Sequence, residues 1–271
     1  MTEKFFKVLK AGQSVHGGNL TWSLPNGDTP GEWHEVEGEP VLCSRGLHLT
    51  DNLREWWTPG AKAYEAEVSE DATRTSYTKN GCKIAVSKCR LVRELAPDEL
   101  IPHGIIVAGV VYETKPGETI IVDGGTVTAL GNSNVTALGN SNVTALGNSK
   151  VTALENSNVT ALGNSKVTAL GNSKVTARGN SNVTALGNSK VTARGNSKVT
   201  ARGNSKVTAL GNSKVDAAGA ATIIWLDGAV APSCKEDAIV VDRRTAGSVS
   251  VFGSSGRYGE PESAPCMNPK C

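Results

Sequence analysis

Basic side chains recur at a fixed spacing through the middle of this chain. Residues 126–218 contain seven lysines and three arginines, but only Glu155 and Asp216 as acids, so the segment carries +8 while the whole chain carries +2. Evenly spaced ammonium and guanidinium groups can meet the phosphates of a polyanion. The same segment has no aromatic side chain on which bases could stack. The pattern therefore fits either an anion-binding surface or an ordinary solvated face.

Thiols are the other reactive groups, and none lies in the basic segment. The six cysteines are Cys43, Cys82, Cys89, Cys234, Cys266 and Cys271. The chain starts without an apolar export signal and contains no membrane-spanning apolar run, so we expect reduced thiols, no membrane association and a cytoplasmic protein. A structural zinc ion needs four ligands, and these spacings match no recognised pattern. We therefore expect neither a metal nor a cofactor.

The elements that position the basic side chains are eight-residue repeats. Twelve copies follow without insertion or deletion, anchored by valines from Val127 to Val215. A short constant period is typical of a solenoid. The segment [N/K]-V-T-A-[L/R] favours a strand, because Val and Thr prefer extended backbone, and Gly-Asn-Ser favours a corner. Disorder is the alternative for a polar repeat of low complexity.

Alternation along each strand decides which side chains face inward. With a period of two, Val and Ala point into a thin core, while Asn/Lys, Thr and Leu/Arg point outward. An outward site explains why leucine and arginine exchange freely at one position. We expect two octads per flattened coil, with three per triangular coil as the alternative. The corner asparagines Asn132, Asn140, Asn148 and their equivalents should stack as ladders.

The rest of the chain divides around this array. The "TII" runs at Thr119–Ile121 and Thr222–Ile224, with Trp225, predict larger apolar groups that close the two ends of the core. The fold class is mainly β, with an α+β N-terminal domain before the solenoid. The expected segments are an α+β domain at 1–110, a linker and N-cap at 111–125, the solenoid at 126–222, a C-terminal cap at 223–252 and a disordered tail at 253–271.

Two columns follow if each coil contains sixteen residues. One is an apolar stripe that could mark self-association into a homo-oligomer, or be shielded by neighbouring lysine stems. It consists of Leu138, Leu154, Leu170 and Leu186. The other is a set of stacked cations to which an anionic polymer could bind. It consists of Lys174, Arg178, Lys190, Arg194 and Lys206.

The N-terminal hundred residues carry a recognisable pattern. It reads "HGGNLTW", then "GEWHEVEG", "LCSRGLHLT" and "YEAEV". This pattern resembles an uncharacterised small domain of bacteriophage and actinobacterial proteins. The resemblance implies a phage or bacterial origin, and hence a bacterial cytoplasm or a virion as the location. It implies hardly anything about function.

Two further resemblances suggest alternative functions. "HG" at His16 and "GLHLT" around His48, followed by the acidic strand with Glu65 or Glu67, resemble ADP-ribosyltransferase-like folds. That resemblance implies His16, His48 and Glu67 as catalytic candidates. The octads resemble the tandem octapeptides of ice-nucleation proteins, but here charged side chains flank each threonine. We expect a non-enzymatic structural or interaction protein, with polyanion binding, ADP-ribosyl transfer and ice binding as alternatives.

Overall fold

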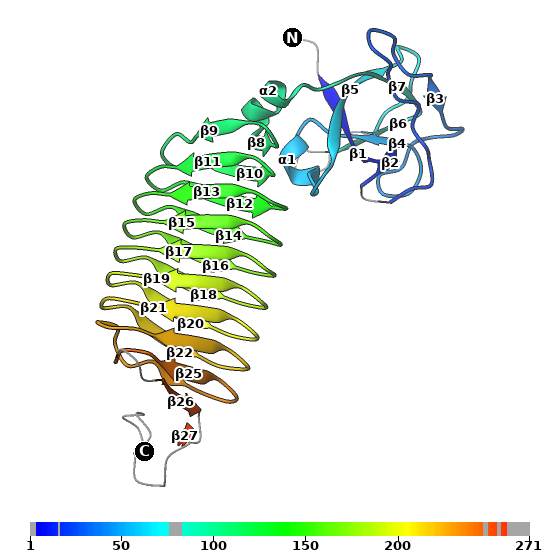
Figure 1. Ribbon diagram of the computed structural model, residues 1–271. Helices are drawn as coiled ribbons and strands as arrows, with labels where there is room; N and C mark the ends of the chain where they lie inside the picture. The colour runs from blue at the N-terminus through cyan, green and yellow to red at the C-terminus, as the bar shows by residue number, and fades with distance from the viewer. Residues whose placement is uncertain (1–3, 16, 76–82, 246–248, 254–255, 259–271) are drawn as a thin grey trace. The chain divides into compact units, whose positions relative to one another are not determined.

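A computed structural model describes residues 4–15, 17–75, 83–245, 249–253 and 256–258 (Figure 1). The chain divides into two compact units, Met1–Ile105 and Ile106–Cys271. The first is a small α+β unit and the second is a parallel β-solenoid, as the sequence predicts. No helix in the described part of the chain has the length and apolarity to cross a membrane.

The N-terminal unit is built on a five-stranded sheet with the strand order β2-β1-β5-β7-β3. Its strands are β1 (Phe5–Lys10), β2 (Gln13–Ser14), β3 (His34–Glu35), β5 (Lys62–Val68) and β7 (Lys88–Glu94). A second pair, β4 (Leu47–Leu49) and β6 (Ile84–Val86), is antiparallel. Short helices follow at α1 (Leu53–Trp56), α2 (Pro97–Leu100) and η1 (Ile101–His103). The core contains Leu9, Trp22 and Leu91.

The solenoid consists of two sheets whose strands alternate along the chain (Figure 1). The even-numbered sheet contains β8 (Ile105–Val107), β10 (Thr119–Asp123), β12 (Asn134–Leu138), β14 (Lys150–Ala153), β16 (Lys166–Ala169), β18 (Asn182–Ala185), β20 (Lys198–Ala201), β22 (Lys214–Ala217) and β24 (Ser233–Cys234). The odd-numbered sheet contains β9 (Val111–Glu113), β11 (Thr126–Ala129), β13 (Asn142–Ala145), β15 (Asn158–Ala161), β17 (Lys174–Ala177), β19 (Lys190–Ala193), β21 (Lys206–Ala209), β23 (Thr222–Trp225) and β25 (Ile239–Asp242).

The pairing register fixes the length of a coil. Val135 pairs with Val151 and Val143 with Val159, so each coil contains two octads and the triangular alternative is wrong. Every residue of an octad therefore lies beside its own copy in the next coil. The spacing changes only in the flanking coils, where Thr119 pairs with Asn134 and Thr222 with Ile239. The flanking sequences thus add coils of their own beyond residues 126–222.

The interior of the coils contains a layer that the alternation rule did not predict. Valine and alanine are buried, as expected, but the corner serines, from Ser133 to Ser213, are also completely buried, with 0% exposure. In a typical coil, the Ser165 hydroxyl donates to the carbonyl oxygens of Leu162 (2.6 Å) and Ala145 (3.1 Å). The serine hydroxyl therefore bonds to the corner carbonyl of Leu162 and adds a second bond to Ala145 O, which also accepts the Leu162 N–H. The serine occurs in eleven of the twelve octads, and Ala221 takes its place in the last.

The corners follow their expected chemistry with one exception. The corner glycines adopt positive φ, for example 64° at Gly171, and Glu155 occupies the same position with φ 55°. The asparagine ladders are confirmed: Asn172 Nδ2 donates to Asn156 Oδ1 (3.5 Å), and Asn196 Nδ2 donates to Asn180 Oδ1 (3.3 Å). An amide carries both a donor and an acceptor, so it can bond to its own copy.

Both ends of the core carry larger side chains. Ile120 is buried in the first coils, and Ile223 and Trp225 are buried in the last. After β25 the chain turns back as the antiparallel strands β26 (Ser250–Gly253) and β27 (Gly256–Tyr258). Part of the tail expected to be disordered from residue 253 is therefore strand. The remainder of that tail lies outside the described residues.

Candidate functional site

The odd-numbered sheet presents the five cations that the sequence singles out. Lys174 pairs with Lys190, and Lys190 pairs with Lys206, so three lysines follow one another at the strand starts. Adjacent strands are about 4.8 Å apart. Arg178 and Arg194 follow the ends of two of these strands and are exposed. We call these five residues the odd-face cations.

The even-numbered sheet carries as many cations, which the sequence reasoning had not grouped. They are Lys150, Lys166, Lys198, Arg202 and Lys214. Their lysine column is interrupted, because Asn182 lies between Lys166 and Lys198. Asp216 follows on the same face. The two faces therefore match in number of cations but differ in continuity.

The cations of both columns form no ion pairs with described residues. The ion pairs of the described part of the chain lie in the N-terminal unit and at Arg244–Asp242. Each lysine column and the adjacent asparagine ladder line a shallow groove. One groove contains Lys174, Lys190 and Lys206, and the other contains Lys150, Lys166 and Lys198.

The leucine stripe is less exposed than its outward position suggests. Leu138 is buried, with 8% exposure, and Leu154, Leu170 and Leu186 are half-buried. The leucine at the end of each of these even-numbered strands is therefore partly covered by its neighbours. Arg202, which continues the same column, is exposed.

Of the three catalytic candidates in the N-terminal unit, the structure describes His48 and Glu67, and each has a different interaction partner. The Nε2 atom of His48 accepts a hydrogen bond from the backbone N–H of Cys43 at 3.0 Å. Burial lowers the pKa of His48, and the nearby charges of Lys83 and Lys7 lower it further. Glu67 instead pairs with Arg90 at 2.6 Å. His16 lies outside the described residues.

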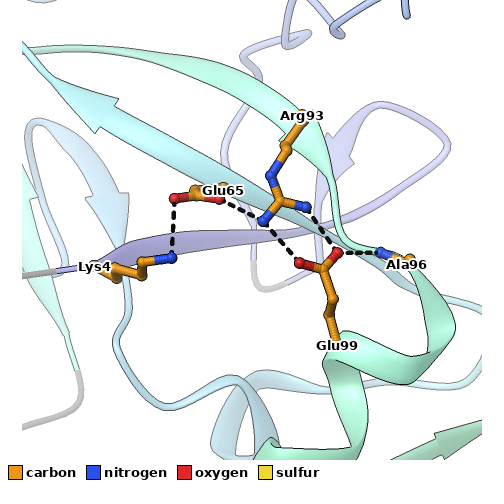
Figure 2. Close-up of polar contacts among 5 residues, drawn as sticks. All are labelled: Lys4, Glu65, Arg93, Ala96 and Glu99. Carbon is orange, nitrogen blue, oxygen red and sulfur yellow. Dashed lines mark hydrogen bonds and ion pairs between the residues drawn. The ribbon is translucent and has the colours of Figure 1, made fainter. Parts of the chain in front are cut away.

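The neighbouring acid of that strand is occupied in the same way. Figure 2 shows Glu65 between Lys4 (3.6 Å) and Arg93 (2.7 Å). Arg93 also binds both carboxylate oxygens of Glu99, and Glu99 accepts the backbone N–H of Ala96 at 2.8 Å (Figure 2). Strand β5 therefore presents carboxylates that are held by cations of this unit.

The described cysteines do not form a metal site. Cys43 and Cys89 are free thiols, and Cys82, Cys266 and Cys271 lie outside the described residues. Within the described ranges, no three His, Cys, Asp or Glu side chains gather as metal ligands. Burial raises the pKa of the Cys89 thiol to about 12, so this thiol is neutral and unreactive at neutral pH.

These features give two chemically distinct regions: continuous cations on the solenoid, and an N-terminal unit whose strand carboxylates are paired. Comparison with known proteins finds no matching family model, no matching curated protein and no matching solved structure.

Proposed function

We propose that this protein is a non-enzymatic scaffold, in which a stiff β-solenoid displays the N-terminal unit. The observation that carries the proposal is the pairing register, which is identical from one octad coil to the next. Identical coils form a ladder in which each coil is held by its two neighbours. Such a body holds its ends at a separation set by the number of coils.

Changing the number of coils tests this proposal. Duplicating residues 158–189 adds two coils and should lengthen the solenoid by about 10 Å, since each rung adds about 4.8 Å. The stability per coil should stay the same. Small-angle scattering and thermal unfolding of the full chain measure both. An unchanged maximum dimension, or a chain that no longer folds, would argue against a modular spacer.

A matched control uses half a coil. Duplicating residues 158–165 adds one octad and moves every later strand to the opposite sheet. The strands that pair with the cap are unchanged, because β23 still pairs with β21 and β25 with β23. We therefore expect the cap to keep its protection from hydrogen exchange while it follows the opposite sheet. A loss of protection in the cap would mean that the solenoid accepts insertions of whole sixteen-residue coils only.

The non-enzymatic part needs its own test. Incubation with labelled NAD and a bacterial lysate should leave no transferred ADP-ribose label. A label that disappears with Glu67→Ala would overturn the proposal, because Glu67 would then have to leave Arg90 to act. The mass of the protein in solution tests the self-association that the leucine stripe suggests. A monomeric mass would contradict self-association.

A second function is favoured by the absence of ion pairs at the octad cations among the described residues: binding of an anionic polymer along the odd-face cations. Lysine ammonium groups one rung apart repel each other, by roughly 1 kcal/mol per pair in water. A polyanion along the column would relieve this repulsion and release its own counterions. Asp216 lies on the even-numbered sheet, and Glu155 lies in a corner one coil before the corner that leads to Lys174. No acid therefore lies between the three odd-face lysines.

Two fourfold variants test the polymer site. The odd-face variant is Lys174→Asn, Arg178→Leu, Lys190→Asn and Arg194→Leu. The even-face control is Lys150→Asn, Lys166→Asn, Lys198→Asn and Arg202→Leu. Both remove four charges and use residues found in other octads. The odd-face variant should lose heparin or DNA retention and its salt dependence, while the control keeps most of both. Equal losses would show only non-specific charge attraction.

A further inference from the structure

The N-terminal unit contains a cavity of about 80 Å³. Its wall includes Phe6 and Lys7 from β1, His48 from β4, Thr50 directly after β4, Trp56 from α1, and Lys83. One water needs about 10–15 Å³ of such space, so the cavity has room for several waters. The cavity therefore suits a group of a few heavy atoms, not a large substrate.

Lys7 is the most unusual group in this wall. Its side chain is buried, with 8% exposure of the residue, and its Nζ donates to the His48 carbonyl oxygen at 3.0 Å. The Nζ also lies 4.8 Å from the centre of the Trp22 ring. An ammonium has three donors, and burying it without a counter-charge is costly. Among the described residues, no carboxylate pairs with Lys7.

Lys83 brings a second positive charge to the same cavity. Its Nζ lies 5.0 Å from the centre of the Trp56 ring and contacts the Cys43 sulfur at 3.5 Å. It forms no ion pair with any described residue. No aspartate or glutamate belongs to the described cavity wall. Two ammonium groups thus border one small cavity without an opposing carboxylate.

The protonation of Lys7 responds to this environment. Its pKa is lowered to about 8, mainly by burial and to a smaller extent by the charge of Lys83, while Cys89 acts in the opposite direction. Because the Cys89 thiol is neutral near pH 7, it supplies no counter-charge. An anion in the cavity would favour the charged form of Lys7 and so raise its pKa. Binding at pH 8 would then be accompanied by proton uptake.

We propose that this cavity is a binding site for a small oxyanion, a phosphate group or one of similar size, held between Lys7 and Lys83. The cavity supplies the space, the two ammonium groups supply the charge, and Trp56 supplies an apolar wall beside them. Charge-assisted hydrogen bonds from ammonium groups to phosphate oxygens are shorter and stronger than neutral ones. The oxyanion could be free or the end group of a phosphate ester.

Calorimetric titration of the full chain tests the site. The probes are inorganic phosphate, sulfate and a small phosphomonoester such as phenyl phosphate. Tighter binding of the monoester identifies an end group as the ligand, and tighter binding of inorganic phosphate identifies the free ion. Repeating the titration at pH 8 in two buffers of different ionisation enthalpy should reveal proton uptake. Failure of all three probes to bind at millimolar concentration would overturn the proposal.

Single substitutions locate the binding. Lys7→Met and Lys83→Met keep length and apolar stem but remove the charge, and each should weaken phosphate binding at least tenfold. Lys10→Met is the control, because Lys10 lies at the end of the same strand and donates to the Pro59 carbonyl oxygen outside the cavity. Since Lys83 is only partly buried, its variant remains informative if Lys7→Met does not fold. Phosphate binding by Lys83→Met at wild-type strength would refute the site.

The odd-face variant of the solenoid separates this proposal from polymer binding. It retains Lys7 and Lys83, so its affinity for phosphate in the N-terminal cavity should not change. Phosphate binding that disappears with the odd-face substitutions would assign the ion to the solenoid and overturn the cavity site. Loss of heparin retention alone would leave the cavity site supported.

Discussion

The two units solve the problem of buried and charged groups in opposite ways. On the five-stranded sheet of the N-terminal unit, cations pair with acids, as Arg90 pairs with Glu67 and Arg93 pairs with Glu65 and Glu99. Lys7 and Lys83 at the cavity are exceptions, because neither forms an ion pair with a described residue. In the octad coils each residue lies beside its own copy, so a lysine meets a lysine. A register of identical residues cannot make ion pairs along a column. It favours side chains that can form hydrogen bonds with the same side chain in the next coil.

This difference explains which positions of the octad vary. Asparagine carries a donor and an acceptor, and the buried serine bonds to backbone carbonyls, so both are self-sufficient in a stack. Leucine and arginine exchange at a corner where no partner is required. The N-terminal unit has no such repetition, so each contact there is made once. In the solenoid, the effect of a substitution on stability should therefore depend on its position in the octad. In the N-terminal unit, it should depend on the partner of the individual residue.

The largest expected effect comes from a charge in the solenoid core. Val175, with 3% exposure, becomes an uncompensated buried carboxylate in Val175→Asp, which should cost on the order of 3–5 kcal/mol. Leu170→Arg places an arginine where three other octads already have one and should change stability by about 0.5 kcal/mol. Thermal unfolding followed by circular dichroism compares them. Similar losses would contradict the facing of the two positions.

The next effect concerns the serine layer. Ser205 Oγ donates to the Arg202 carbonyl oxygen at 2.6 Å, with Ala185 O at 3.2 Å, and Ser205→Ala should cost about 1 kcal/mol. Ser213 is buried, but its hydroxyl has no hydrogen-bond partner among the described residues. Ser213→Ala is therefore the matched control and should be neutral. Denaturant unfolding measures the stability of both variants. Equal losses of stability would show that the serine contributes by packing and not by hydrogen bonding.

A smaller gain is expected at Glu155, the exception among the corner glycines. An L-residue in this left-handed conformation costs about 1–2 kcal/mol, and glycine recovers part of that at an entropic cost in the unfolded chain. Glu155→Gly should raise stability by about 0.5–1 kcal/mol. Glu155→Ala removes the same charge but keeps the strain and should give no gain. A matching gain in both variants would assign the effect to charge.

The sequence predicted the solenoid well because the relevant signals are local and repeated twelve times. Strand, corner and inward valine follow from one octad and its period, whereas the choice between two and three octads per coil needed the pairing register. Burial of the serine was missed, since a polar corner residue is normally solvated and only the stacked corner closes over it. The cavity around Lys7 was missed because β1, β4 and Lys83 are distant in sequence. Pairing of Glu67 with Arg90 also depends on a long-range antiparallel register.

The smallest expected effect lies in the N-terminal unit, at Glu99. Its hydrogen bonds with Arg93, followed by that from the Ala96 N–H, lower its pKa from 4.5 to about 2. A lowered pKa in the folded state means that the carboxylate stabilises the fold above about pH 4.5 and loses that contribution as pH falls toward 2. Because the pair is largely exposed, the contribution should stay below about 1 kcal/mol.

Glu99→Gln should therefore be slightly less stable than the wild-type protein at pH 7, and the difference should shrink steadily between pH 4.5 and pH 2. Tryptophan fluorescence during urea unfolding reports mainly on this unit, because four of the five tryptophans lie in the first 57 residues. Other carboxylates titrate in the same range, but they are common to both proteins and cancel in the difference. A difference in unfolding free energy that stays constant with pH would show that the Glu99 side chain stabilises the fold by packing and not by its charge. The contrast between paired charges in the N-terminal unit and stacked charges in the solenoid would then have no counterpart in stability.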